Sequence, residues 1–261
     1  MEQLNRLSKS TTKVEPTVSI ESCKRVIEIE SQCLLAYLRL VKSATPWRIL
    51  FEDPHLIVLS KPAGLLSQGE KTGDENLVDQ LRTYFGRHYV GLVHRLDRNT
   101  SGLMVVAKRT KSAQRLTEAL QSGKLSRTYL AWVIGKIPAP VRWEHRLEKN
   151  PTTNRVSVSR SPQAKLAILH AMPMNYRRWQ GTELTLVKFE LETGRSHQIR
   201  AQASHEGFPL LGDVKYQKSK AAPAFTRVAL HSFEIQFPHP MTHEILKFED
   251  ELPPDLAHLL N

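Results

Sequence analysis

After residue 46, hydrophobic and polar positions alternate in short runs that are typical of β-strands. The segments ILFED and LIVLS flank Asp53, Pro54 and His55, which predicts two strands that meet at a turn. In RTYLAWVIG, apolar side chains occupy both alternating faces, so we expect a strand that is buried on both sides. Further strands are expected at residues 155–159, 165–170, 183–192 and 228–237.

Helical periodicity is confined to a few segments. Residues 75–85 carry one apolar stripe that ends at Gly86, and a second helix is expected from Thr110, as its cap, to Gly123. The segment SHQIRAQASHEG predicts a short helix that ends at Gly207. Strands mixed with few helices predict an α+β domain around a mixed, largely antiparallel sheet with flanking helices.

The pattern of polar and apolar residues changes at Trp47. Residues 1–46 begin with a polar segment and then contain an expected helical stretch at 21–42. We interpret them as an N-terminal extension and residues 47–261 as the main domain.

Composition narrows the class of partner. The chain has 37 Lys and Arg against 26 Asp and Glu, a formal net charge of +11, which favours a polyanionic partner such as nucleic acid over a merely soluble basic protein. Its two cysteines, Cys23 and Cys33, are too few for a disulfide framework and have no metal-ligand spacing. No apolar run reaches the length that crosses a bilayer, and we expect a cytoplasmic protein.

Candidate chemistry is concentrated in the segment HRLDRNTSG, residues 94–102. Two apolar, strand-like runs flank it, so its polar residues are expected on a loop between strands, where catalytic groups commonly lie. Asp97 lies at its centre. A turn-closing aspartate is the structural alternative for this residue.

Four separated segments together resemble the RluA-type pseudouridine synthase family. They are KPAG at 61–64, HRLDRNTSG at 94–102, RTYLAWVIG at 127–135 and GRSHQIRAQASHEGFPLLGDVKY at 194–216. Their order and spacing also match the family. The resemblance covers residues 47–248 and implies a pseudouridine synthase fold with a central RNA-binding cleft.

The resemblance implies isomerisation of specific uridines in structured RNA, without a metal, redox cofactor or energy source. Asp97 matches the catalytic carboxylate, which acts as a nucleophile or base. Tyr129 matches a tyrosine that stacks on the target base, although its strand also suits a core tyrosine. Arg195 matches an arginine that pairs with Asp97; a cation at the start of the expected helix calls for an anionic partner.

Other positions carry weaker expectations by the same resemblance. Arg95 is expected to fill or brace the space that a flipped base leaves. Lys61 is expected to contact phosphate or support the pocket floor. A contact with RNA and a purely structural role are about equally expected for His94, His197 and Arg200. For Leu230, a place in the uracil pocket and a place in the hydrophobic core are equally expected.

The chain also departs from the family pattern. Gln202 stands where many members have a second histidine after HQIR, so an RNA contact at this position is in doubt. Residues 1–46 contain no recognisable accessory RNA-binding domain. The expected partner is RNA, ribosomal or transfer, without a membrane or an obligate protein partner, and we expect a monomer.

Two other classes remain as alternatives. One is a catalytically silent RNA-binding protein with the same fold, which a product assay would distinguish. The other is a metal-dependent nuclease with ligands such as His239 and His243, but Pro240 between them argues against a shared helix.

Overall fold

The computed structural model describes residues 45–70, 73–86, 89–217 and 223–261. Residues Thr45–Asn261 form one compact unit. The helix expected at residues 21–42, and both cysteines, lie outside the described residues.

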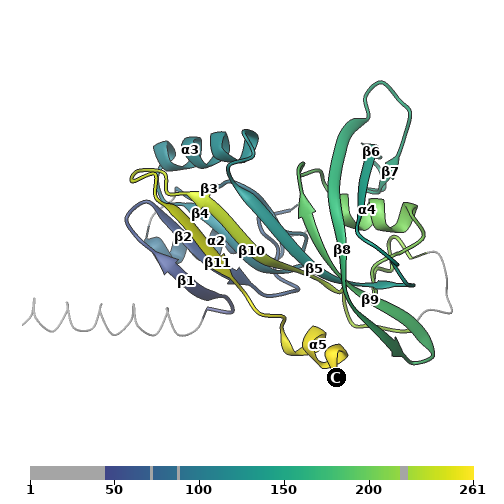
Figure 1. The fold of residues 1–261 in the computed structure, drawn as a ribbon. Coiled ribbons are helices and arrows are strands. Elements are labelled where there is room, and N and C mark those ends of the chain that lie inside the picture. The colour runs from purple at the N-terminus through teal and green to yellow at the C-terminus, as the bar shows by residue number, and fades with distance from the viewer. Residues whose placement is uncertain (1–44, 71–72, 87–88, 218–222) are drawn as a thin grey trace, which may run out of the picture. The chain divides into compact units, whose positions relative to one another are not determined.

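One large sheet organises this unit (Figure 1). Its main path runs β1-β2-β4-β10-β5-β9-β8-β6-β7, with β11 paired to β10 and β3 to β4. The strands are β1 (Arg48–Glu52), β2 (Leu56–Lys61), β3 (Gly91–Leu92), β4 (Ser101–Ala107), β5 (Ser126–Ile134), β6 (Val141–Lys149), β7 (Val156–Val158), β8 (Lys165–Trp179), β9 (Thr182–Leu191), β10 (Leu230–Pro238) and β11 (Ile245–Glu249). The helices are α2 (Leu77–Phe85), α3 (Thr110–Gln121), α4 (Gln198–His205) and α5 (Pro254–Ala257), followed by the short 3-10 turn η1 (His258–Leu260).

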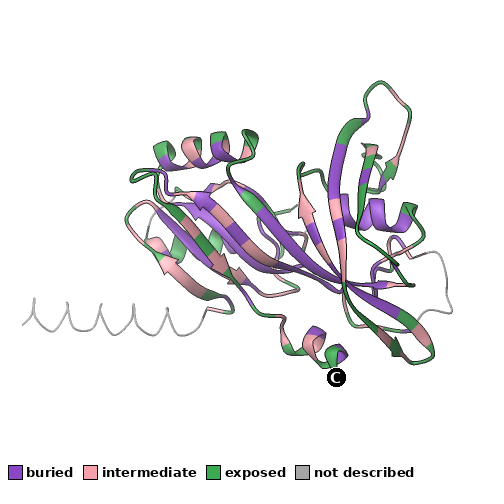
Figure 2. Ribbon diagram, viewed as in Figure 1, coloured by how far each residue is buried: buried purple, intermediate pink, exposed green. Residues whose placement is uncertain are grey.

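The expected α+β class and largely antiparallel sheet are confirmed. The β4–β10 pair is parallel, and the other strand pairs of the described residues are antiparallel. Buried residues run through the central strands (Figure 2). In β5 seven consecutive residues are buried, as its two apolar faces predict.

Helices lie against the sheet at positions that the sequence largely predicts. Helix α2 is capped by Asn76, whose side chain accepts a hydrogen bond from the Asp79 N–H, and ends at left-handed Gly86. Helix α3 contacts β4 and β10, and α4 contacts β6 and β7. The capping role expected for Thr110 is wrong, because Arg109 occupies the cap position and Thr110 is the first helical residue.

The parallel junction between β4 and β10 depends on a glycine. A Cβ built on Gly102 would lie 2.3 Å from the carbonyl oxygen of Ser232, and the φ of Gly102 is +109°. Both the close approach and the backbone conformation therefore favour glycine here. Because Gly102 ends the HRLDRNTSG segment, this junction fixes one end of the loop that carries Asp97.

Candidate active site

A cavity of about 1380 Å³ lies at the meeting point of three predicted motifs. Its walls come from the loop between β3 and β4, from β5, and from the segment that precedes α4. Asp97, Tyr129 and Arg195 all line it.

Asp97 projects from a tight turn. The Thr100 N–H donates to the Asp97 carbonyl oxygen at 3.0 Å, and the Asp97 side chain is 31% exposed. Its Oδ2 accepts a hydrogen bond from Arg200 Nη1 at 2.7 Å, and His197 Nε2 lies 3.8 Å from the same oxygen. The turn and the catalytic interpretation are therefore compatible, since the turn presents the carboxylate to the cavity.

Arg200 is the cation that fixes Asp97. It lies on α4, is only 8% exposed, and also binds Asp213 through Nε at 2.7 Å and Nη2 at 2.8 Å. Asp213 is completely buried. Burial acts against the charged guanidinium, but the hydrogen bonds and charge of Asp213, together with Asp97, raise the pKa of Arg200. The arginine is thus a permanent cation held between two carboxylates.

The expected pairing of Arg195 with Asp97 is wrong. Arg195 is exposed, and its Nε donates to the Leu166 carbonyl oxygen at 2.9 Å. The reason is the helix start: α4 begins at Gln198, so Arg195 lies in the preceding turn. The expected contact of Arg200 with RNA phosphate is wrong for the complementary reason, because its guanidinium is buried and already bound to carboxylates.

Tyr129 occupies the wall of the cavity. It is 5% exposed on β5, and burial raises the pKa of its hydroxyl, while the charge of Arg127 acts in the opposite direction. Arg127 lies two residues earlier and lines the same cavity. Side chains two residues apart on a strand share a face, so the two groups enter the site together.

His94 and Lys61 are built into the protein. His94 Nε2 accepts a hydrogen bond from the Val105 N–H at 3.2 Å; burial, with the charge of Arg127, lowers the pKa of His94 to about 3. The Lys61 Nζ donates to the carbonyl oxygens of Pro62, Leu65 and Arg98 at 2.8, 2.8 and 3.2 Å. Lys61 is fully buried, so the expected phosphate contact is wrong, whereas support of the pocket loops agrees with these bonds.

Of the other predicted positions, two line the cavity and one lies in the hydrophobic core. Arg95 is exposed and lines the cavity. His197 also lines it, in a left-handed conformation with φ 50°, and its Nδ1 lies 2.8 Å from the Tyr216 hydroxyl. Leu230 is not among the described residues that line the cavity; it is buried in the core cluster that includes Tyr129. Because Tyr129 belongs to the same cluster and lines the cavity, the expected place of Leu230 in the uracil pocket stays a prediction.

Two groups of this site, Asp213 and Arg127, were not predicted from the sequence. Each left a trace in the quoted motifs. Asp213 is an acidic residue directly after the apolar run FPLLG, and a carboxylate at a buried position requires a cation. Arg127 lies two residues before Tyr129 in RTYLAWVIG, and this spacing alone predicts that the two side chains share one face of the strand.

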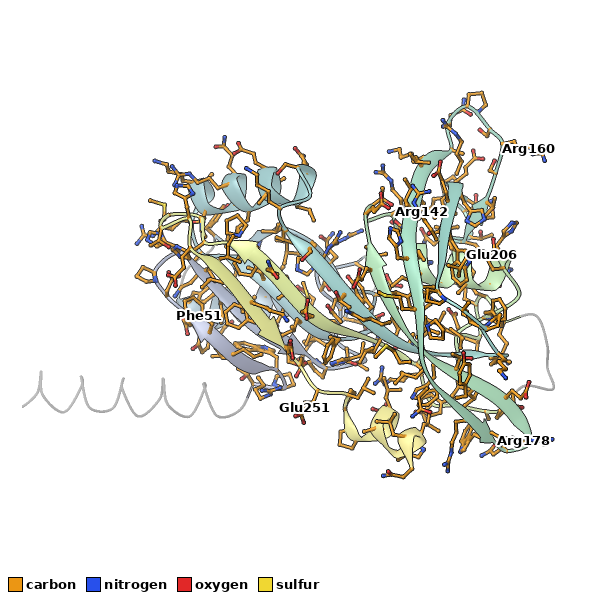
Figure 3. The ribbon with its side chains drawn as sticks, in the orientation of Figure 1. Phe51, Arg142, Arg160, Arg178, Glu206 and Glu251 are labelled. Atoms are coloured by element: carbon orange, nitrogen blue, oxygen red, sulfur yellow. The ribbon has the colours of Figure 1, made fainter. Side chains whose placement is uncertain are left out.

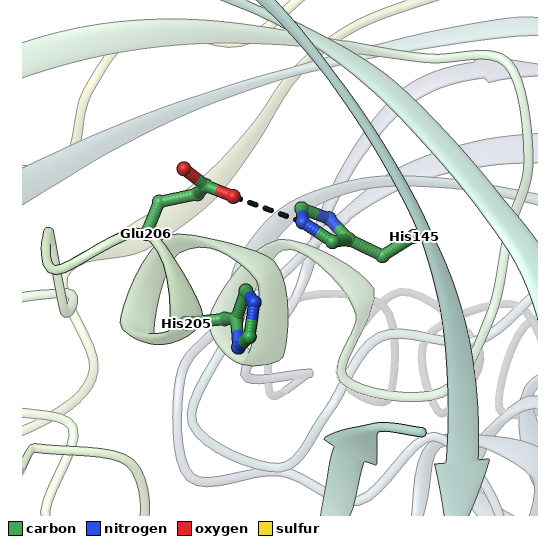
Figure 4. A group of neighbouring side chains, drawn as sticks. All are labelled: His145, His205 and Glu206. Carbon is green, nitrogen blue, oxygen red and sulfur yellow. Dashed lines mark ion pairs between the residues drawn. The ribbon is translucent and has the colours of Figure 1, made fainter. Parts of the chain in front are cut away.

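A second cluster lies outside the cavity, at the C-terminal end of α4 (Figure 4). His145, His205 and Glu206 place one potential ligand atom each within 4.8 Å of one another. However, His145 Nε2 lies 2.9 Å from Glu206 Oε1, and its Nδ1 lies 3.0 Å from Gln202 Nε2. Since the amide nitrogen can only donate, Nδ1 accepts and Nε2 carries the proton. Both imidazole nitrogens are then satisfied by protein groups, which explains the cluster without a metal.

Gln202 and His239 have structural contacts as well. Gln202 is fully buried, and its amide nitrogen lies 3.3 and 3.2 Å from the carbonyl oxygens of Trp143 and Ala167, which attaches α4 to β6 and β8. His239 Nε2 lies 2.9 Å from Asp53 Oδ2. Within the described residues His239 belongs to no group of three or more potential metal ligands.

Comparisons with known proteins agree with the four motifs. A family model described as RNA pseudouridylate synthase matches residues 55–205. Ribosomal large subunit pseudouridine synthase D of Vibrio vulnificus is 34% identical over 231 residues, which cover 82% of this chain and 70% of that protein. The uncharacterized RNA pseudouridine synthase YhcT of Bacillus subtilis is 35% identical over 226 residues, covering 81% and 70%.

Solved structures agree in fold. The human RNA Pseudouridylate Synthase Domain Containing 1 aligns with a TM-score of 0.69 and 24% identity, covering 80% of this chain and 86% of that one. The human RNA Pseudouridylate Synthase Domain Containing 4 aligns with a TM-score of 0.67 and 22% identity, covering 87% and 96%. Among the helices of the described residues, none combines the length and the apolar character needed to span a bilayer.

Proposed function

Since the chain belongs to the RNA pseudouridylate synthase family and isomerises uridine in RNA, we propose that Asp97 is its catalytic carboxylate and that Arg200 holds Asp97 in place. The observation that carries this proposal is the chain of contacts Asp97–Arg200–Asp213 beside the cavity. Arg200 orients the Asp97 carboxylate through its hydrogen bond, and Asp213 keeps Arg200 fixed from the opposite side.

The geometry suits a flipped nucleotide. A uridine stacked in folded RNA is inaccessible, so the base has to be extruded into the cavity. Tyr129 provides a buried aromatic wall there, and we assign it the role of stacking on the uracil. The partly exposed Asp97 carboxylate then meets the ribose or the ring, as a nucleophile or as a base.

The reaction leaves the composition of the RNA unchanged. The bond from ring nitrogen N1 to ribose C1′ breaks, and its electron pair stays on the base. After the base turns, C5 bonds to C1′, the proton on C5 leaves, and N1 takes up a proton. The enzyme therefore has to hold the detached base in position while it turns, and a cavity that is lined on several sides supports this.

For the substrate we propose ribosomal RNA of the large subunit. The similar Vibrio vulnificus protein is named for that substrate, and basic side chains including Arg95, Lys149 and Lys215 line the cavity, where they can neutralise phosphates. With ribosomal RNA as the substrate, we propose a cytoplasmic location. The proposed groups come from a single chain, which is consistent with action as a monomer.

The test is a pseudouridine map of total RNA from cells with the gene, without it, and with Asp97→Asn supplied in its place. We expect one or more uridines of large-subunit RNA to be modified only with the native gene. Modification restored by Asp97→Asn would exclude the catalytic assignment. Identical maps with and without the gene would instead favour a silent RNA-binding protein.

A further inference from the structure

Arg127 is a nearly buried cation inside the cavity. It lies on β5, is 9% exposed, and shares a strand face with Tyr129. Both residues line the cavity beside Asp97. The side chain assigned to stacking on the uracil thus has a guanidinium as its neighbour.

This guanidinium has no counter-ion in the described part of the chain. No carboxylate there lies within ion-pair distance of Arg127, and its Nε is buried without a hydrogen-bond partner. Asp97 is bound to Arg200 instead. A desolvated cation without an anion is costly to the fold. The cost indicates that the missing negative charge comes from the substrate.

The protein makes room for this cation. A Cβ built on Gly194 would lie 2.7 Å from Arg127 Nη2 and 3.1 Å from Nη1. The backbone at Gly194, in the segment before α4, therefore packs directly against the Arg127 guanidinium, although Gly194 itself is exposed. A side chain at this position would displace the guanidinium without deleting it.

We propose that Arg127 donates hydrogen bonds to a carbonyl oxygen of the flipped uracil and stabilises the negative charge that the base acquires during the isomerisation. The inference rests on the proposed function. Breaking the N1–C1′ bond leaves the electron pair on uracil, spread over N1, O2 and O4; attack of Asp97 on the ring places it on O4. Charge therefore reaches the carbonyl oxygens by either route, and a prepositioned guanidinium favours that state.

The alternative anion is a phosphate of the RNA backbone. The position of Arg127 argues against it, because this side chain is nine-tenths buried beside Tyr129, whereas exposed Arg95 and Lys149 line the same cavity. The flipped base goes deepest into the cavity, and the phosphates stay with the strand outside it. Arg127 is thus placed for the base.

The experiment compares three variants with native enzyme on an RNA that carries the mapped uridine: Arg127→Met, Arg127→Lys and Gly194→Ala. Single-turnover rates report on the charged state of the base, and RNA binding measured across a salt series reports on phosphate contacts. Arg178→Met is the matched control, because Arg178 is exposed at the far end of the β8–β9 hairpin, outside the cavity lining (Figure 3).

We expect Arg127→Met to lower the single-turnover rate by about 100-fold or more, as for loss of an oxyanion donor. Its RNA affinity should stay within about threefold of native, with an unchanged salt slope. Gly194→Ala should lower the rate in the same direction, and Arg127→Lys should restore only part of it, since an ammonium lacks the two-pronged geometry. The control should match native enzyme.

Two results would overturn the proposal. An unchanged rate in Arg127→Met removes any catalytic contribution. A weaker affinity with a salt slope reduced by about one, at native rate, identifies a phosphate contact instead. If Arg127→Met does not fold, Gly194→Ala decides, because it keeps the arginine and changes an exposed position. Failure of the proposed function is a separate outcome, since native enzyme itself would then form no pseudouridine.

Discussion

The turn at residues 193–197 and helix α4 that follows it treat two arginines of one motif in opposite ways. Arg195, in the turn, is exposed and bound to a single backbone carbonyl. Arg200, on the helix, is bound by a carboxylate on each side. A place in the lining of the same cavity as Asp97 is therefore not what makes an arginine the partner of that aspartate. Arg200 pairs with Asp97 because it lies on a helix and because a second carboxylate, Asp213, binds the other side of its guanidinium.

The second anion changes what the first contact means. Because Asp213 accepts hydrogen bonds from two of the guanidinium nitrogens, Arg200 stays in place independently of its bond to Asp97. Arg195 has no such anchor among the described residues. Substitutions that remove either arginine, or the carboxylate that anchors Arg200, test this difference directly.

The largest effect is expected for Arg200→Met compared with Arg195→Met. The first leaves Asp213 buried without a partner and should cost about 3–5 kcal/mol in the free energy of unfolding, together with most of the activity. The second should change the free energy of unfolding by less than about 0.5 kcal/mol. Urea denaturation and a product assay on both variants measure this. Equal losses would contradict the distinction between turn and helix.

Asp213→Asn should have the next largest effect. It keeps the shape of the side chain but removes the anchoring charge, so the free energy of unfolding should fall by about 2–3 kcal/mol. Turnover should also fall, because Arg200 is then held mainly by Asp97. Asp213→Glu should not restore it fully, since the site is completely buried. Native turnover in Asp213→Asn would show that Arg200 needs no second anion.

The stability of the fold should depend on pH through the buried His94 but not through an exposed histidine. Buried His94 has a pKa of about 3, below the ordinary value near 6.5, so between these values the unfolded chain binds a proton that the folded one does not. Stability should therefore fall as the pH drops below about 6.5, by at most about 1.4 kcal/mol per unit from this group. His94→Asn should flatten the slope in denaturation at pH 7 to 4. The same change at exposed His258 is the control.

The smallest effect is expected at the opposite end of α4. Glu206→Gln removes the partly exposed pair with His145 and should change the free energy of unfolding by less than about 1 kcal/mol. Turnover should stay native, because Gln202 attaches the helix to the neighbouring strands independently. A large loss of turnover would mean that the His145–Glu206 pair positions Arg200.

The strands with apolar runs could be predicted from the sequence. β1, β2 and β5 follow their hydrophobic patterns, and α2 follows its stripe and its terminal glycine. β6 was missed because it lies near the edge of the sheet and carries charged residues on an exposed face. Its buried Trp143 and Leu147 are too widely spaced to predict a strand by themselves.

The candidate site could be predicted as a set of motifs but not as a set of contacts. Asp97 and Tyr129 line the cavity as expected. Which arginine meets Asp97 depends on where α4 begins, and His197 in a left-handed conformation sets that point. A single sequence does not reveal such a backbone conformation at a residue other than glycine. Arg127 and Asp213 were missed because their importance comes from burial, which only the assembled sheet creates.

The place of β10 has a consequence for biosynthesis. This strand follows every other strand except β11, yet it lies between β4 and β5 in the sheet. Until residues 230–238 have emerged from the ribosome, β4 and β5 each present an edge that lacks its central partner. At about 5–20 residues per second, the wait after β4 is on the order of ten seconds. During that interval the nascent chain carries unpaired strand edges that are open to wrong pairing, and Asp97 meets Arg200 in a sheet with its central strand in place only after residues 230–238 have emerged.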